Sequence, residues 1–252
     1  MKVENERKRN LKKVSFSLVL FFFSNFNDTV FFMVGIVDYN AGNIKSVERA
    51  LSFLKADYVL SKNPADLEGC DRLIFPGVGE AKYAMEQLKK TGFDTFLRDW
   101  AKAGKPLVGI CLGSQIIFEH SEEGDVDCLG LLKGTIRHFE TVWNASTTLS
   151  DHNSGAVSLS NRKVPHMGWN NLSYVNGSSP LFAGVSETSD FYFVHSYLIQ
   201  PSDESIVKAY ADYGCRVPAC VSSGSVTAFQ FHPEKSGRAG LKILENYIKS
   251  TD

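Results

Sequence analysis

The chain has 252 residues, of which 43% are hydrophobic, so it can bury a substantial core in one large domain or two small ones. Lysine plus arginine (27) nearly balances aspartate plus glutamate (28), which argues against a protein that neutralises many phosphates and against nucleic acid as a partner. Five cysteines without a CxxC pair argue against a disulfide framework or a structural zinc site. We expect no metal, no cofactor and a reducing compartment, the cytoplasm. Four cysteines are expected to be inert buried side chains: Cys70, Cys128, Cys215 and Cys220.

Residues 1–32 differ in composition from the rest of the chain. A basic stretch, "MKVENERKRNLKKV", precedes a short apolar run, "VSFSLVLFFF", which together resemble the start of a signal peptide. The segment at 24–28 lacks a small-x-small cleavage site, and the apolar run is about half of the ~20 residues that a spanning helix needs. We therefore expect a disordered extension or a mispredicted start, without stable membrane insertion, and a functional domain that begins at Met33.

From Met33 the chain alternates short apolar runs with amphipathic segments. The run "MVGIVDY" (33–39) predicts a buried strand, and residues 43–54 place apolar side chains on one helical face. Further strands are predicted at 57–60, 72–77 and 105–111, and helices at 80–90 and 93–103. Near-continuous apolar strands that alternate with helices are typical of a parallel sheet covered on both faces. The predicted fold class is α/β, a doubly wound, mostly parallel open sheet with helices on both faces.

After Gly124 the predicted strands become short and alternate apolar with polar residues. They lie at 135–140, 170–175, 190–199, 206–214 and 226–232, and a closing helix is predicted over 239–249. The polar segment 144–161 is expected to be a surface loop or hairpin. No repeat or Pro-rich linker interrupts the chain, so a β-rich C-terminal half within a single domain, 33–252, is predicted.

Cys111 lies between two glycines at a predicted strand-to-helix turn, in "VGICLGSQIIFE" (108–119). The spacing Gly109-x-Cys111-x-Gly113 is that of a nucleophile elbow, in which glycines permit a tight turn and a close approach of backbone. Amides at the start of the next helix could activate the thiol and bind an oxyanion. A buried cysteine in a turn whose glycines serve only packing is the alternative, and the motif alone leaves the two level.

A base for such a thiol is present in "AFQFHPEKS" (228–236). His232 follows an apolar strand, and Glu234 lies two residues later, on the same side of an extended backbone. The carboxylate can therefore reach the ring from behind while the ring faces Cys111. As an isolated tripeptide, His-Pro-Glu would more often be a solvated turn. In combination with the turn at Cys111, the catalytic interpretation of His232 and Glu234 is favoured instead.

These two motifs resemble those of the class I (triad) glutamine amidotransferases, which release ammonia from the side chain of glutamine. Within that family, four more segments look like the glutaminase subunit of imidazole glycerol phosphate synthase: "IVDYNAGNIKSVERAL" (36–51), "LIFPGVG" (73–79), "VPHMGWN" (164–170) and "YFVHSY" (192–197). The match runs from about Met33 to the C-terminus and leaves out residues 1–32. It implies a class I glutamine amidotransferase-like fold.

The resemblance implies a role for each matched residue. Cys111 would be the nucleophile, His232 the base and then the acid, and Glu234 its orienting partner. Five residues would bind the oxyanion or glutamine: Gly77, Val78, Gly79, Leu112 and Gln115. The two glycines around Val78 would let its peptide flip. Six residues are suspected at a partner interface: Asn40, Asn43, His166, Met167, Trp169 and Lys235. As lone histidines, His166 and His195 are expected to be structural groups rather than second bases.

Ser114 departs from the family, which usually has methionine or histidine at this position, and the change could alter the glutamine pocket. The expected partner is a separate (β/α)₈ cyclase subunit, in a heterodimer that keeps ammonia from solvent. The same triad could instead serve anthranilate, aminodeoxychorismate or GMP synthesis, although "PHMGWN" and "DYNAGN" argue against this. A degenerate binding module would lack a triad member, and none is lacking here. A cysteine protease or a γ-glutamyl hydrolase is a further alternative.

Overall fold

The computed structural model describes residues 32–149, 162–175 and 179–250, which belong to a compact unit spanning Phe31–Asp252. Predictions for residues 1–31 and for 150–161 lie outside the described residues. The elements of the first half are β1 (Val34–Val37), α1 (Ile44–Phe53), β2 (Tyr58–Ser61), β3 (Arg72–Gly77), α2 (Ala81–Thr91), α3 (Phe93–Lys102) and β4 (Leu107–Cys111). Each was predicted from its apolar pattern. No helix in the described ranges has the length and apolar character that crossing a membrane requires.

The main sheet has eight strands in the order β2-β1-β3-β4-β14-β13-β12-β9. Its second-half strands are β14 (Val226–Phe229), β13 (Arg216–Ser223), β12 (Val207–Asp212) and β9 (Ser173–Tyr174). The five strands from β2 to β14 pair in parallel, and the remaining three continue the sheet in antiparallel fashion. The predicted doubly wound, mostly parallel α/β fold with a β-rich second half is confirmed.

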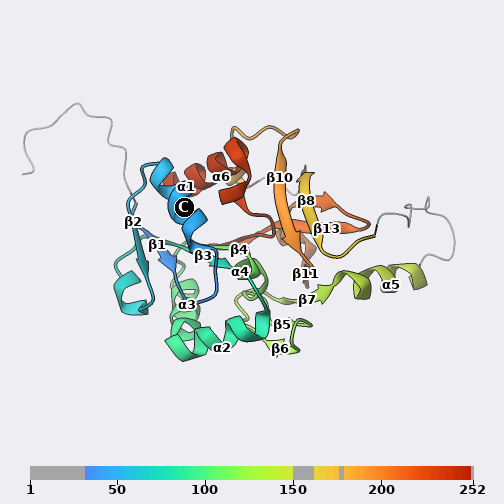
Figure 1. The fold of residues 1–252 in the computed structure, drawn as a ribbon, viewed down its shortest axis with the longest axis horizontal. Coiled ribbons are helices and arrows are strands. Elements are labelled where there is room, and N and C mark those ends of the chain that lie inside the picture. The colour runs from blue at the N-terminus through green and yellow to red at the C-terminus, as the bar shows by residue number, and fades with distance from the viewer. Residues whose placement is uncertain (1–31, 150–161, 176–178, 251–252) are drawn as a thin grey trace, which may run out of the picture. The chain divides into compact units, whose positions relative to one another are not determined.

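The two faces of the parallel strands carry different helices, because successive side chains point to opposite faces. Ile74 and Val108 face a layer that includes α1 and the long closing helix α6 (Gly237–Lys249). Leu73, Phe75 and Leu107 face the layer that includes α2 and α3. Figure 1 shows the two pairs of helices on opposite sides of the sheet. Both faces of β1, β3 and β4 are therefore buried, as their near-continuous apolar sequences require.

Two smaller sheets lie beside the main one in the second half. One pairs β10 (Asp190–His195) with β8 (His166–Asn171), and the other orders β11 (Tyr197–Pro201), β7 (Gly134–His138), β5 (His120–Ser121) and β6 (Val126–Asp127). The single strand predicted over 190–199 is therefore two strands in two sheets, separated at Ser196. A continuous apolar alternation cannot reveal this crossing, because the pattern does not specify the pairing partner.

Two further differences from the sequence predictions have local causes. The predicted strand 135–140 ends at His138, and α5 (Phe139–Leu149) occupies the start of the predicted loop 144–161. Phe139 and Trp143, four residues apart, place aromatic rings on one side of α5 against Leu198. β13 was not predicted, and it contains Pro218, which is unusual inside a sheet. The register between β12 and β13 shifts beside this proline, so an irregularity accommodates it.

The short helix α4 (Leu112–Gln115) returns so closely over β3 that it leaves no room for a side chain at Gly113. A Cβ placed there would lie 2.0 Å from the Phe75 carbonyl oxygen. A Cβ at Gly109 would likewise lie 2.8 Å from the Gly113 carbonyl oxygen. Both glycines are therefore required by backbone that approaches within van der Waals range.

We expect Gly113→Ala to lower the free energy of unfolding by about 3 kcal/mol, because the methyl group would force α4 away from β3. Gly69→Ala is the matched control, since a Cβ there meets nothing within 4 Å. It should change stability by less than about 0.5 kcal/mol. Urea denaturation of both variants measures the difference, and equal losses would contradict the close approach described here.

Candidate active site

Cys111 lies at the strained turn between β4 and α4. Its φ of 55° and ψ of −113° lie outside the regions that L-residues ordinarily occupy, and only 7% of the residue is exposed. Such a backbone persists only where the surrounding structure imposes it. Here the close packing of Gly109 and Gly113 imposes it. The packing and nucleophile interpretations of the two glycines are thus compatible, because the packing creates the strained turn.

His232 and Glu234 form a buried pair at the end of the chain segment that follows β14. The ring nitrogen Nδ1 of His232 lies 2.8 Å from Oε1 of Glu234, and each side chain is 2% exposed. The predicted contact between them is present, although the backbone forms a 3₁₀ turn over Pro233–Lys235 rather than an extended strand. The His232 amide donates to the Tyr192 carbonyl at 2.9 Å, which anchors the turn on β10. The other ring nitrogen, Nε2, is buried and makes no hydrogen bond with the described residues.

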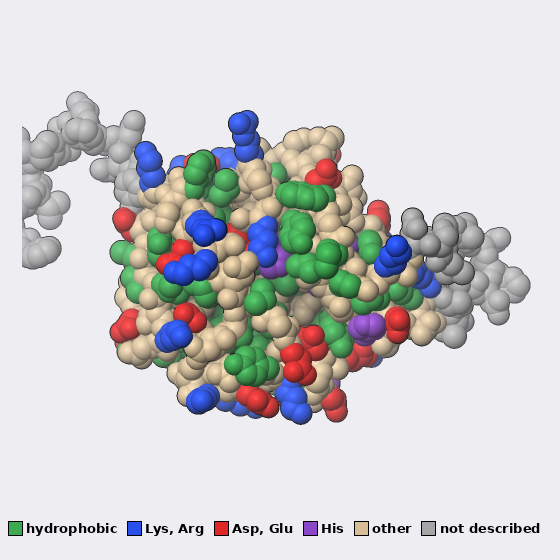
Figure 2. Space-filling model, viewed as in Figure 1, with side chains coloured by type: hydrophobic (Ala, Val, Ile, Leu, Met, Phe, Trp, Pro, Cys, Tyr) green, Lys and Arg blue, Asp and Glu red, His purple; other side chains and the backbone are tan. Residues whose placement is uncertain are grey.

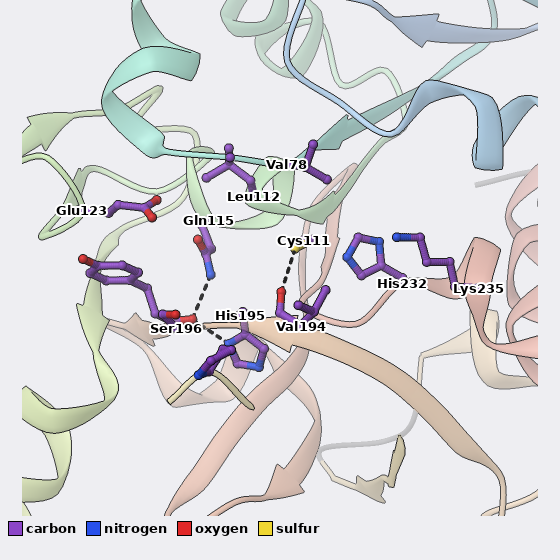
Figure 3. Close-up of a pocket in the computed structure, with 13 residues that line it drawn as sticks. Val78, Cys111, Leu112, Gln115, Glu123, Val194, His195, Ser196, His232 and Lys235 are labelled. Atoms are coloured by element: carbon purple, nitrogen blue, oxygen red, sulfur yellow. Dashed lines mark hydrogen bonds between the residues drawn. The ribbon is translucent and has the colours of Figure 1, made fainter. Parts of the chain in front are cut away.

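A cavity of about 290 Å³ brings Cys111 and His232 together. Figure 3 shows the sulfur and the imidazole next to each other on one side of it. The thiol donates to the Val194 carbonyl at 3.7 Å. Five other predicted site residues line the same cavity: Val78, Gly79, Leu112, Gln115 and Lys235. Residues from β4, the β3–α2 loop and the turn after β14 therefore meet at the carboxyl edge of the parallel strands, where ligands of doubly wound sheets bind.

The two glycines that flank Val78 have different surroundings. Gly79 has a φ of 98° and open space around its missing Cβ. A Cβ on Gly77 would lie 2.6 Å from both the Gly113 amide nitrogen and the Tyr39 hydroxyl. The Val78 side chain between them is 37% exposed. Conformational freedom in this loop is therefore confined to the Gly79 side.

Gln115 is held at the floor of the cavity by its amide nitrogen. Nε2 donates to the Tyr197 carbonyl at 2.8 Å and to Oε1 of Gln230 at 3.0 Å. Its carbonyl oxygen is the polar atom left for a ligand. Ser114 lies beside it but does not line the cavity, because it is fully buried and donates to the Cys111 carbonyl at 2.6 Å.

Two features of the cavity were missed in the sequence. Glu123 lines it from the loop after β5, and its Oε2 accepts the Ala81 amide at the start of α2 at 2.8 Å. Burial raises the pKa of Glu123, and this amide opposes the shift. The backbone of residues 194–197, at the crossing from β10 to β11, forms another wall. Glu123 lies among several acidic residues at 119–123, and nothing in that run distinguishes one carboxylate from its neighbours.

The charge state of His232 depends on its two neighbours. Burial lowers the pKa of the imidazole, but the interactions with Cys111 and Glu234 outweigh burial and raise the pKa to about 9. The ring is therefore protonated at neutral pH. Burial instead raises the pKa of the other four cysteines, as expected for inert thiols.

The residues suspected at a partner interface differ in exposure. Met167 and Trp169 are 61% and 59% exposed on β8, whereas His166 between the sheets is 2% exposed. The Trp169 ring lies 5.9 Å from that of Tyr192, and the Lys235 ammonium also lies 5.9 Å from the Tyr192 ring. Figure 2 shows hydrophobic side chains gathered over β8 and β10. Asn40 and Asn43 lie in the loop after β1, where Asn40 accepts from Lys62 and Asn43 from Ser46.

The chain is similar to known proteins both in sequence and in fold. The family model "Glutamine amidotransferase class-I" matches residues 35–250. A relative from Geobacillus kaustophilus, "Imidazole glycerol phosphate synthase subunit HisH", is 45% identical over 217 residues, which cover 86% of this chain and 96% of the relative. A HisH subunit from Nitratidesulfovibrio vulgaris is 40% identical, over 85% of this chain and 95% of its own. A solved glutamine amidotransferase with 21% identity has a TM-score of 0.61 and covers 85% of this chain and 98% of its own, a similarity of fold.

We expect the His232 ring to titrate near pH 9 and to lose its proton at a lower pH in Glu234→Gln, because the carboxylate stabilises the imidazolium. Nitrogen-15 NMR of the ring measures both midpoints. Glu119→Gln is the control, since Glu119 accepts the Gly134 amide away from this ring, and it should leave the midpoint unchanged. A wild-type midpoint near the ordinary value of 6.5 would contradict the ion pair.

Proposed function

The chain belongs to the class I glutamine amidotransferases, and we propose that it is the glutaminase subunit of an imidazole glycerol phosphate synthase. The matched family and the HisH relatives establish a glutamine-hydrolysing enzyme. The cavity that joins a strained cysteine to a buried His-Glu pair is the observation that carries the proposed chemistry.

In the proposed first half-reaction, the Cys111 sulfur attacks the side-chain carbonyl carbon of glutamine. Transfer of the Cys111 thiol proton to His232 Nε2 gives the thiolate, which is the attacking species, and the protonated ring supplies its counter-charge. Because that ring already carries a proton at neutral pH, its first act toward the substrate is to donate it to the departing nitrogen. Ammonia leaves, and a γ-glutamyl thioester remains on the sulfur.

The second half-reaction uses the same ring in the opposite sense. Neutral His232 takes a proton from water, and the resulting hydroxide attacks the thioester carbonyl. Glutamate is released, and the sulfur and the imidazolium are restored. Glu234 contacts Nδ1 at 2.8 Å throughout and holds the ring so that Nε2 serves both proton transfers.

Each attack creates a negative oxygen, for which we propose two amide donors. Leu112 begins α4, and the amide of a first helical residue has no acceptor within its own helix. The second donor would come from the Gly77–Gly79 loop, where the freedom at Gly79 allows the Val78 peptide to turn. One such donor is worth about 10²–10³-fold in rate in other enzymes.

Glutamine would be held by opposite charge at the far side of the cavity. The Glu123 carboxylate is the acidic side chain that lines it and would bind the α-ammonium group of the substrate. The free amide oxygen of Gln115 would accept a hydrogen bond from the same group. Both side chains are fixed by bonds to backbone, so the cavity is preorganised.

We further propose that a separate cyclase subunit docks over β8 and β10 in a cytoplasmic heterodimer and receives the ammonia. Met167 and Trp169 present apolar surface beside the basic Lys235, which also lines the cavity. Exposed aromatic and methionine side chains are typical of interface anchors. A sealed mouth would keep ammonia from becoming ammonium in water. The alternative acceptors of anthranilate, aminodeoxychorismate or GMP synthesis receive less support from the HisH relatives.

Glutamine turnover with the purified cyclase subunit and its nucleotide ligand tests the proposed function. We expect strong stimulation of the wild type, and a loss of at least about 10⁴-fold in Cys111→Ala, which lacks the nucleophile. Cys220→Ala is the control, because Cys220 is fully buried in the sheet away from the cavity. Activity retained by Cys111→Ala would overturn the proposed mechanism, and no response to the cyclase would overturn the proposed partner.

The docking surface makes a separate prediction. The double variant Met167→Ala, Trp169→Ala should weaken cyclase binding by at least about 30-fold, since large exposed anchors contribute about 2 kcal/mol or more when buried. Phe53→Ala removes an even more exposed ring, 74% accessible, from the end of α1 and is the control. Isothermal titration calorimetry measures both. Equal affinities for the two variants would place the partner elsewhere.

A further inference from the structure

Two histidines that the proposed chemistry does not use lie buried beside the cavity. His166 on β8 and His195 at the end of β10 face each other in the antiparallel register. They are 2% and 6% exposed, and His166 Nδ1 lies 3.0 Å from His195 Nε2. His195 also lines the cavity next to Val194, which accepts the Cys111 thiol. The pair thus joins the strand with exposed Met167 and Trp169 to the cavity wall.

The hydrogen bonds of the pair can run in only one direction. The Tyr197 carbonyl, 2.7 Å from His195 Nδ1, has no proton, so Nδ1 of His195 is the donor. Nε2 of a neutral His195 is then an acceptor, and His166 Nδ1 must donate to it. His166 Nε2 is left as an acceptor and faces the Asn170 amide nitrogen at 3.4 Å. Donation therefore passes from Asn170 through both rings to Tyr197.

This series of hydrogen bonds ends at the Tyr197 carbonyl oxygen, which also holds Gln115 at the floor of the cavity. The Tyr197 carbonyl accepts Gln115 Nε2 at 2.8 Å in addition to His195. A carbonyl oxygen has two lone pairs, so these two donors complete its capacity. The same bond spans Ser196, where the chain crosses from β10 to β11. Figure 3 shows His195 and Ser196 below Gln115, at the wall of the cavity.

We propose that His166 and His195 are positioning residues for glutamine. His195 braces the 194–197 crossing by donating a hydrogen bond to Tyr197, the first residue of the next strand, β11, and His166 fixes the tautomer and orientation of His195. The brace sets the Tyr197 carbonyl, and through it Gln115, at the place where the substrate binds. This inference rests on the proposed glutaminase function and adds two residues to its binding machinery.

The surroundings of the two histidines keep both rings neutral, as donation in a single direction from Asn170 to Tyr197 requires. His166 stacks at 4.5 Å on Phe193 and at 4.0 Å on Tyr213, and His195 lies 5.3 Å from Phe139. Burial lowers the pKa of His166 to about 4, and burial together with the neighbouring His166 and His232 rings lowers that of His195 to about 3. Protonation of either ring would place two N–H groups face to face.

Two substitutions of His195 separate the brace from the contact between the rings. An asparagine amide nitrogen is bonded to Cγ, as Nδ1 is, so His195→Asn can still donate to Tyr197. A glutamine amide lies one bond further out, as Nε2 does, so His195→Gln can reach His166 but not Tyr197. Each variant loses one hydrogen bond, and their melting temperatures should therefore be similar.

We expect His195→Gln to raise the KM for glutamine about tenfold, as loss of one positioning hydrogen bond would. His195→Asn should stay within about threefold of the wild type, and kcat should change by less than KM in both. The assay uses the protein with its cyclase and nucleotide. Tyr213→Phe is the control, because it keeps the ring stacked on His166 and removes only a hydroxyl bonded to the Lys163 carbonyl.

Equal KM values for the two His195 variants, or lower stability with unchanged KM, would overturn the positioning role. Nitrogen-15 NMR of the wild type gives a second test that needs no variant. Both rings should be neutral and protonated on Nδ1 at pH 7. An Nε2–H tautomer on either ring would contradict the proposed direction of the hydrogen bonds from Asn170 to Tyr197. An inactive wild type would refute the proposed function. The tautomers would still test the direction of the hydrogen bonds between His166, His195 and Tyr197.

Discussion

The close approach of α4 to β3 is the constraint on which the rest of the site depends. With only 2.0 Å between a Cβ at Gly113 and the Phe75 carbonyl oxygen, the chain must turn sharply at the end of β4. Cys111 absorbs that turn in a left-handed backbone with a φ of 55°. The strain costs on the order of 1–3 kcal/mol, which the packing of buried apolar residues on both sheet faces offsets. The side chain so placed lies at the end of β4, in contact with the buried core and with the cavity.

The order of strands explains how distant parts of the sequence reach that side chain. β14 pairs in parallel with β4, although more than one hundred residues separate them in the chain. Parallel neighbours end at the same edge, so the segment that follows β14 brings His232 to the sulfur. The three strands beyond β14 then run antiparallel, and a separate two-stranded sheet, β8 with β10, supplies the cavity wall.

The sequence revealed what is encoded locally and missed what depends on pairing. The glycines around Cys111 and the spacing of His232 and Glu234 are local, and each was interpreted from a few neighbouring residues. The α/β pattern of the first half was equally plain, because apolar period and turn residues agree there. Nothing in the sequence marks Ser196 as the end of a strand, because the alternation of apolar and polar residues continues across it. The strands on its two sides nevertheless belong to different sheets. Glu123 and the His166–His195 contact arise from tertiary proximity, which no spacing along the chain records.

Two histidines border one cavity, and their environments give them opposite charge. His232 and His195 are both buried, and burial lowers the pKa of each. Only His232 has an anionic partner, the Glu234 carboxylate at 2.8 Å, together with the Cys111 sulfur. The partners of His195 are the neutral Tyr197 carbonyl and the His166 imidazole. The charge of His232 lowers the pKa of His195 further. The Cys111 sulfur and the Glu234 carboxylate together therefore decide which ring can exchange protons, and the ring that lacks such partners holds the cavity wall in place.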